Sequence, residues 1–176
     1  GFTETGREED ARIEKELVDI ARKGGIRLIG PNCMGIYCPE GGVAWTRDFP
    51  TVSGSIGFFS QSGQMAYHVI RGSDRQQLRY SKVVSFGNAC DLQAQDFLNY
   101  LNTDESTRVI GAYLEGIKDG QAFLEAAANA TRKKPLVIWK GGQTQGGSRA
   151  TLSHTAAIAG SQKIWDGLCQ QAGIIS

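Results

Sequence analysis

The sequence contains few of the residues on which metal sites and disulfide scaffolds depend. It has four cysteines and two histidines. Cys33 and Cys38 lie close together, but no further cysteine or histidine follows them at the spacing of a zinc site. We therefore expect that this chain binds no metal and that its thiols are free, as in a reducing cytoplasm.

The chain also lacks an excess of charge of one sign and any long apolar run. Its 19 basic and 18 acidic residues leave a net charge of +1, which gives no overall field to attract nucleic acid or an anionic membrane. No stretch reaches the roughly 20 apolar residues that a membrane-spanning helix needs. With 176 residues, 40% of them hydrophobic, the sequence indicates one globular domain and a fragment of a second.

Two common phosphate-binding signatures are missing. The glycine-dense segment 141–148 is not followed by the Gly-Lys-Ser/Thr of a Walker A loop. No Gly-x-Gly-x-x-Gly opens a helix after a first strand, so the dinucleotide-binding fingerprint is absent as well. Any anion site must therefore be built from other elements.

The N-terminal segment, residues 1–35, resembles the end of a domain. Residues 8–24 carry apolar side chains on one stripe and predict an amphipathic helix, and residues 26–29 predict a short strand. A helix and a strand with no earlier strand cannot form a βαβ unit, so we expect residues 1–35 to be the last part of a preceding domain. Residues 36–53, which contain several prolines and glycines, are predicted to be a connector.

Residues 54–176 have the pattern of an α/β domain, in which apolar runs alternate with amphipathic segments. The predicted strands are Ile56–Phe59, Lys82–Phe86, Val109–Leu114 and Leu136–Trp139. The predicted helices are Gly63–Arg75, Ala94–Asn102, Gln121–Arg132 and Ser161–Ala172. Because the strands are continuously apolar, we expect helices on both faces of the sheet. The fold prediction is a three-layer, doubly wound parallel sheet.

Ligands of such sheets bind at the carboxyl ends of the strands. Polar or glycine residues follow three predicted strands there: Ser60, Gln61, Ser62 and Gly63, then Gly87 and Asn88, then Glu115. The serine-rich turn opens a helix, where a serine cap, free backbone N–H groups and the helix dipole favour an anion. After the second strand a tight turn, with Asp91 as a helix cap, is the simpler interpretation.

His154 lies on the loop after the fourth strand, between Ser153 and Thr155. A loop histidine on its own is usually a surface residue, although its largely neutral ring is nucleophilic at cell pH. Glu115 belongs to the same predicted sheet edge, and a carboxylate there can orient an imidazole and stabilise its charged form. Together with the anion-binding helix end, this favours a chemical role for His154.

In this order and at these separations, the motifs resemble the NDP-forming acyl-CoA synthetases (acetate–CoA ligases, ADP-forming) and the α-subunit of succinyl-CoA synthetase. The shared segments run almost end to end: Gly30-Pro31-Asn32-Cys33, Ser60-Gln61-Ser62-Gly63, Gly87-Asn88, Leu114-Glu115-Gly116, Lys134-Pro135, Ser153-His154-Thr155 and Ala159-Gly160-Ser161. The resemblance implies that residues 54–176 form a flavodoxin-like domain. It also implies that residues 1–35 end a Rossmann-like, CoA-binding domain.

The resemblance also implies roles for individual residues. His154 would be phosphorylated during turnover, and Glu115 would contact it. The phosphate would bind at Ser60, Gln61, Ser62 and Gly63, and the acyl substrate at Tyr67, Gly87 and Asn88. One departure is Ala156, where the family commonly has glycine, and its methyl group would restrict the histidine loop.

The implied reaction joins a carboxylic acid to coenzyme A, with ATP giving ADP and phosphate, through an acyl phosphate and a phosphohistidine. ATP or ADP and Mg²⁺ would bind to an ATP-grasp domain, which is either a separate β-subunit or a fused domain outside this chain. The rest of the CoA-binding domain is a second implied partner, and the full enzyme is expected to be oligomeric. The isolated chain is therefore expected to be inactive alone.

Two other interpretations stay open. The chain could be a non-catalytic, ligand-sensing or scaffolding module of a protein acyltransferase fusion, but the presence of both His154 and Glu115 favours the enzyme. It could also be a flavin-binding flavodoxin, but the phosphate loop rich in serine and threonine is missing.

Overall fold

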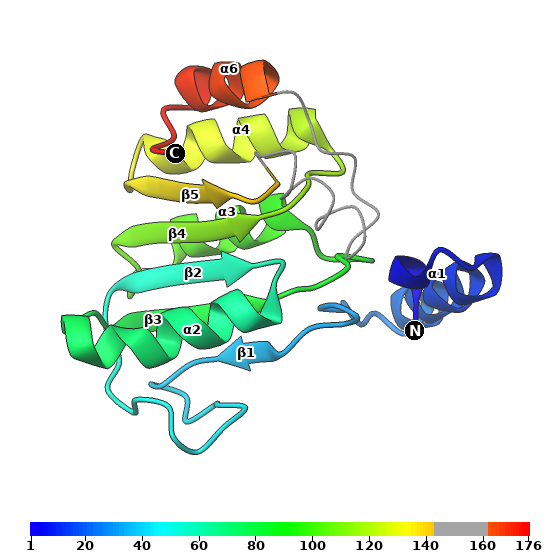
Figure 1. Cartoon of the computed structure of the whole chain (residues 1–176), viewed down its shortest axis with the longest axis horizontal. Coiled ribbons are helices and arrows are strands. Elements are labelled where there is room, and N and C mark those ends of the chain that lie inside the picture. Colours follow the sequence, from blue (N-terminus) through cyan, green and yellow to red (C-terminus); the bar gives the residue numbers. More distant parts are fainter. Residues whose placement is uncertain (143–161) are drawn as a thin grey trace.

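Five strands form one sheet in the computed structural model, which describes residues 1–142 and 162–176 (Figure 1). The order is β1-β3-β2-β4-β5; β1 pairs antiparallel with β3, and all other neighbours are parallel. The strands are β1 (Gly35–Tyr37), β2 (Ile56–Ser60), β3 (Tyr80–Ser85), β4 (Val109–Leu114) and β5 (Leu136–Lys140). The predicted α/β fold is confirmed, with one antiparallel strand added to the sheet.

Helices lie on both sides of the sheet, and α1 lies apart from it, beyond the carboxyl ends of the strands (Figure 1). Figure 1 shows α2 on one face and α3 and α4 on the other, with α6 packed beside α4. They are α1 (Glu8–Lys23), α2 (Gly63–Ser73), α3 (Ala94–Thr103), α4 (Gly120–Thr131) and α6 (Gln162–Ala172), with short 3-10 turns η1 (Thr3–Thr5) and η2 (Asp74–Gln76). Among the described residues, no helix combines the length and the apolar character that crossing a membrane requires.

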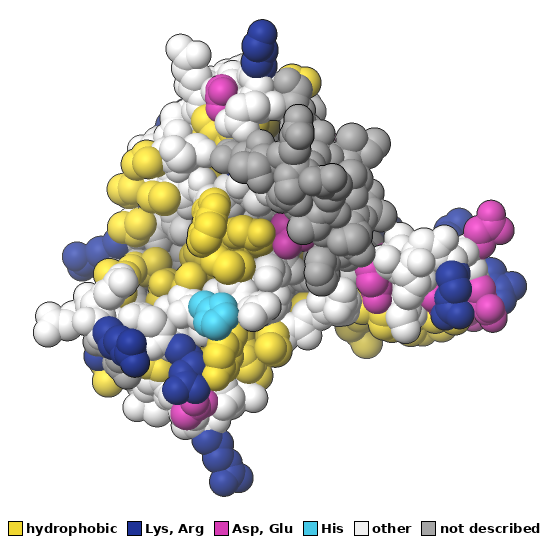
Figure 2. Space-filling model, in the orientation of Figure 1, with side chains coloured by type: hydrophobic (Ala, Val, Ile, Leu, Met, Phe, Trp, Pro, Cys, Tyr) yellow, Lys and Arg dark blue, Asp and Glu magenta, His cyan; other side chains and the backbone are white. Residues whose placement is uncertain are grey.

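The two faces of the sheet carry separate apolar cores. On the α3 and α4 side, the core includes Phe59, Ile110, Leu114 and Phe123, and the α2 side buries Tyr37, Phe49 and Ile70. Covering is incomplete at β5, where Val137 is 44% and Trp139 62% exposed. Figure 2 shows hydrophobic side chains gathered on this open face, over β4 and β5. Among the helices of residues 1–142 and 162–176, α2 covers this face at β2 and β3.

The N-terminal segment forms the predicted helix, α1, but not the predicted strand. Residues 26–29 form no strand and pair with no strand of the described chain. The backbone of Leu28 bonds instead to the turn before α3, because its N–H donates to Asp91 and its carbonyl accepts from Leu92. On α1, the apolar stripe of Ile13, Leu17 and Ile20 stays 41%, 42% and 60% exposed, since no described part of the chain covers it.

The region predicted to be a connector starts inside the sheet. β1 contributes Ile36 and Tyr37, which pair with Val84 and Val83 of β3. A strand of three residues is too short to give a periodic signal, so the sequence pattern misses it. The domain limits at residues 35, 53 and 54 stay predictions.

The position of Asp91 suggested that it caps α3, but the structure gives it another role. That helix begins with a capping box between Gln93 and Asp96. Asp91 is buried and accepts hydrogen bonds from the guanidinium groups of Arg22, at the end of α1, and of Arg27. Arg27 is the largest cause that holds the pKa of Asp91 at about 2, below its ordinary value. This carboxylate ties the N-terminal segment to the domain.

Replacing Asp91 with asparagine is expected to lower the free energy of unfolding by about 1–2 kcal/mol near neutral pH, since both arginines are partly exposed and the pairs are screened. The folded-state pKa lies below the unfolded value, so the carboxylate stabilises the fold above about pH 4 and loses this effect between about pH 4 and 2. Chemical unfolding at several pH values measures the difference between the two proteins. A difference that stays constant down to pH 2 would contradict the assignment.

Candidate functional site

A cavity of about 190 Å³ opens where β2, β3 and β4 end. It is lined by Asn32, Gln61, Ser62, Gly63, Gln64, Gly87, Asn88 and Glu115. All of these except Asn32 and Gln64 were proposed as site residues from the sequence. Parallel neighbours direct their carboxyl ends to one edge of a sheet, which is why residues so far apart in the sequence meet. Asn32 belongs to a shared motif, but nothing in the sequence pattern gave it a role.

The first residues of α2 form one wall of the cavity. Ser62 caps the helix, because its Oγ accepts a hydrogen bond from the N–H of Met65 at 3.3 Å. The N–H groups of Gly63 and Gln64 have no acceptor among residues 1–142 and 162–176. Ser60 is buried beneath the turn, and its Oγ donates to the carbonyl of Ser62 at 2.7 Å rather than lining the cavity. A capped helix start with two free donors suits an anion.

Glu115 follows β4, and Gln61 holds its backbone. The Oε1 atom of Gln61 accepts from the N–H of Glu115 at 2.5 Å and from that of Gly116 at 2.9 Å. The N–H of Gln61 donates to the carbonyl of Tyr113 at 3.1 Å. Gln61 therefore lines the cavity and also uses its side-chain oxygen to fix the turn after β4.

The side chain of Glu115 lies beside Tyr113 and Gly141. Burial raises the pKa of the Tyr113 hydroxyl, and the charge of Glu115 and a hydrogen bond to it raise this pKa further. A methyl group on Gly141 would lie 2.6 Å from the Tyr113 hydroxyl oxygen and 3.5 Å from Cγ of Glu115. A glycine directly after β5 therefore lets the chain pass close to this pair.

On the opposite side, Asn88 joins the cavity to the N-terminal segment. Its Nδ2 donates to the carboxylates of Glu4 at 2.5 Å and Glu14 at 3.1 Å. The predicted tight turn that carries it is present, with a φ of +49° at Gly87. The amide nitrogen of Asn88 is thus engaged with α1 and the turn before it.

Besides Ser60, two predicted site residues are not placed at this cavity. Tyr67 does not line it; the ring packs against Phe49, with 5.6 Å between centroids, and the hydroxyl accepts from Arg71 at 2.8 Å. His154 falls outside the described residues, so its position relative to Glu115 stays a prediction. The substrate role of Tyr67 also stays a prediction.

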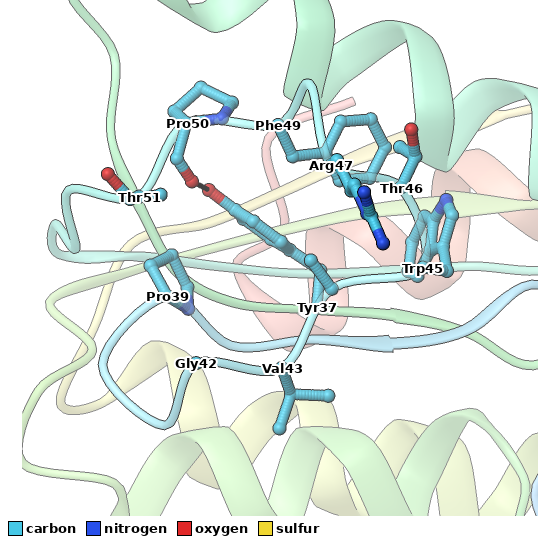
Figure 3. Close-up of a pocket in the computed structure, with 11 residues that line it drawn as sticks. Tyr37, Pro39, Gly42, Val43, Trp45, Thr46, Arg47, Phe49, Pro50 and Thr51 are labelled. Carbon is cyan, nitrogen blue, oxygen red and sulfur yellow. Dashed lines mark hydrogen bonds between the residues drawn. The ribbon is translucent and has the colours of Figure 1, made fainter.

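A second cavity, of about 370 Å³, is larger but chemically poorer. Figure 3 shows the segment 37–51 folding around it, with the hydroxyl of Tyr37 donating to the carbonyl of Pro50 at 2.6 Å. Its lining contains aromatic residues and Arg47, but no carboxylate and none of the predicted site residues. The smaller cavity, with Glu115 and free N–H donors, is the better candidate for chemistry.

Known relatives align with this chain along almost its whole length. The chain is 42% identical over 175 residues to subunit alpha of acetate–CoA ligase [ADP-forming] II from Pyrococcus furiosus, covering 99% of this chain and 38% of that subunit. It is 37% identical to a 4-hydroxybutyrate–CoA ligase [ADP-forming] from Nitrosopumilus maritimus, covering 26% of it. The chain therefore spans well under half the length of these relatives.

A solved structure of a similar protein has the same fold as this chain. It is a dinucleotide-forming acetyl-coenzyme A synthetase 1 of Ca. Korarchaeum cryptofilum in complex with phosphate and ADP. The two structures superpose with a TM-score of 0.89 at 37% sequence identity, and the match covers 99% of this chain and 38% of that one. The model of the family described as "Succinyl-CoA ligase like flavodoxin domain" matches residues 53–176. The chain therefore belongs to the family of succinyl-CoA ligase-like flavodoxin domains.

Proposed function

We propose that this chain is the phosphohistidine-carrying part of an ADP-forming acyl-CoA ligase. The observation that carries the proposal is the cavity at the sheet edge, where the Glu115 carboxylate and the open N-terminus of α2 meet. It is supported by an alignment along 99% of the chain with acetate–CoA ligases. His154 is the proposed nucleophile, Glu115 the carboxylate beside it, and the start of α2 the phosphate site.

The chemistry follows from these groups. The γ-phosphoryl group of ATP is transferred to a ring nitrogen of His154 at a nucleotide site outside the described residues, with release of ADP. The P–N bond then breaks as a carboxylate oxygen of the acid takes the phosphoryl group, and the imidazole returns to its neutral form. The thiol of coenzyme A attacks the acyl carbon, the C–O bond breaks, and phosphate leaves as the thiol loses its proton.

The described residues contribute mainly position and charge. Free N–H groups at the start of α2 stabilise the negative charge of the phosphate without having to reorganise. Positioning and electrostatic stabilisation of this kind are the main sources of catalysis in phosphoryl transfer. Glu115 stabilises the cationic ring of the phosphorylated histidine. Mg²⁺ is proposed to bind together with the nucleotide, in an ATP-grasp domain outside this chain.

Replacing Glu115 with glutamine in the full-length ligase is expected to slow phosphohistidine formation from ATP by about 100-fold. Glutamine keeps the shape and the backbone bonds to Gln61, so only the charge beside the histidine is lost. The matched control is Glu125→Gln, since Glu125 is exposed on α4, where it accepts a hydrogen bond from Gln121. Rapid quenching with labelled ATP measures both rates, and equal rates in the two variants would contradict the role of Glu115.

A further inference from the structure

Lys140 ends β5 and extends along the buried face of that strand. Leu136 and Ile138, which precede it by four and two residues, are buried, and side chains two residues apart share one face of a strand. Its register partner is Leu114 of β4, the residue before Glu115. The aliphatic stem therefore lies on the core side of the sheet, and the half-buried ammonium group reaches the carboxyl edge.

The ammonium group joins two chain segments beyond the last bond of the sheet. Its Nζ donates to the carbonyl of Glu115 and to the carbonyl of Gly141, each at 2.7 Å. The β4–β5 ladder ends one step earlier, where the N–H of Gly141 donates to the carbonyl of Leu114 at 2.8 Å. A carbonyl that lies past the ladder needs another donor, and Lys140 supplies it for both strands.

Lys140 and Gln61 hold Glu115 from two sides. Gln61 accepts from the N–H groups of Glu115 and Gly116, and Lys140 donates to the carbonyl of Glu115. Both peptide units that flank the Glu115 Cα are therefore fixed by side chains. Burial lowers the pKa of Lys140, and the nearby negative charge of Glu115 partly offsets this effect.

We propose that Lys140 is a positioning residue for the phosphoryl transfer, acting through Glu115. It fixes the backbone of Glu115 and the backbone of Gly141, where the segment leading to His154 begins, in a single arrangement. The inference rests on the proposed function. Misplacing a reacting group by about 1 Å can cost about 100-fold in rate, so loss of this link should appear in the transfer step.

The test is Lys140→Met in the full-length ligase, because methionine keeps the apolar stem and removes the donors. The single-turnover rate of phosphoryl transfer from ATP to the protein is expected to fall about 10- to 100-fold. The KM for ATP should not change, because the nucleotide site lies elsewhere. Lys140→Arg keeps charged donors and should restore most of the lost rate. If the methionine variant does not fold, Lys140→Gln replaces it in the same comparison.

Lys134, which lies two residues before β5 begins, offers a matched control. It is also half-buried, and its Nζ also donates to two carbonyls, those of Leu101 at 2.6 Å and Asp104 at 2.7 Å. Lys134→Met should lower the unfolding temperature about as much as Lys140→Met does, and it should leave the rate of phosphoryl transfer unchanged. A wild-type rate in Lys140→Met, or an equal loss of rate in both methionine variants, would overturn the proposal.

The same assay separates this inference from the proposed function. If His154→Ala still accepts the phosphoryl group, the proposed function fails. If His154→Ala loses the label while all Lys140 variants behave as wild type, the function stands and the positioning role is wrong.

Discussion

Replacing His154 with alanine is expected to reduce acyl-CoA formation by the full-length ligase by at least about 1,000-fold, the scale seen when a covalent nucleophile is removed. The proposed reaction passes every phosphoryl group through one ring nitrogen, and alanine offers no substitute. A coupled assay for acyl-CoA measures kcat directly. The loss should fall on kcat, while the affinity for ATP at its separate site should be retained.

The chain provides a control in its other histidine. His68 is exposed on α2, where its ring contacts Tyr67. His68→Ala removes the same side chain from the same domain and should keep the activity within about twofold, as surface substitutions usually do. Activity in His154→Ala comparable with that of His68→Ala would remove the basis of the mechanism.

Replacing Gly87 with alanine is expected to destabilise the domain by about 3 kcal/mol or more, because it combines a strained conformation with an overpacked site. Gly87 has a φ of +49°, and a methyl group there would lie 2.2 Å from the carbonyl oxygen of Pro31 and 2.3 Å from that of Asn32. These neighbours are backbone atoms, which cannot move aside as a side chain could. The 30–32 turn must shift, and the cavity that Gly87 lines changes shape with it.

Thermal and denaturant unfolding measure this loss, and the phosphoryl-transfer rate reports the change in the cavity. The control is Gly72→Ala, in the last turn of α2, where a methyl group would meet nothing within 4 Å. It should leave stability unchanged or raise it by up to about 1 kcal/mol, since alanine favours the helix. Equal stabilities of the two variants would show that the turn tolerates a side chain.

The sequence was sufficient to predict the main elements of the sheet. The strands at Ile56, Val109 and Leu136 are apolar runs with glycine, proline or serine within three residues of each end, and each is followed along the chain by a helix with its own apolar stripe. Because the connections then place all strand ends at one edge, six of the residues that line the cavity could be predicted before any contact was known.

Features that depend on contacts distant in sequence could not be predicted. Lys140 is simply the polar end of an apolar run in the sequence, and only the register of β5 against β4 brings it to the carbonyl of Glu115. The partners of Asp91 could not be predicted either, since Arg22 and Arg27 lie more than 60 residues earlier in the sequence. The 26–29 segment has strand-like residues, but no neighbouring strand is present in the described chain to pair with it.

The most direct test of the central claim is to locate the phosphoryl group on the wild-type enzyme. The full-length ligase is incubated briefly with labelled ATP, digested, and mapped by mass spectrometry under conditions that preserve phosphohistidine. We expect an acid-labile, base-stable phosphoryl group on His154, which is discharged when ADP is added. A phosphoryl group on any other residue, or label that ADP does not remove, would contradict the account.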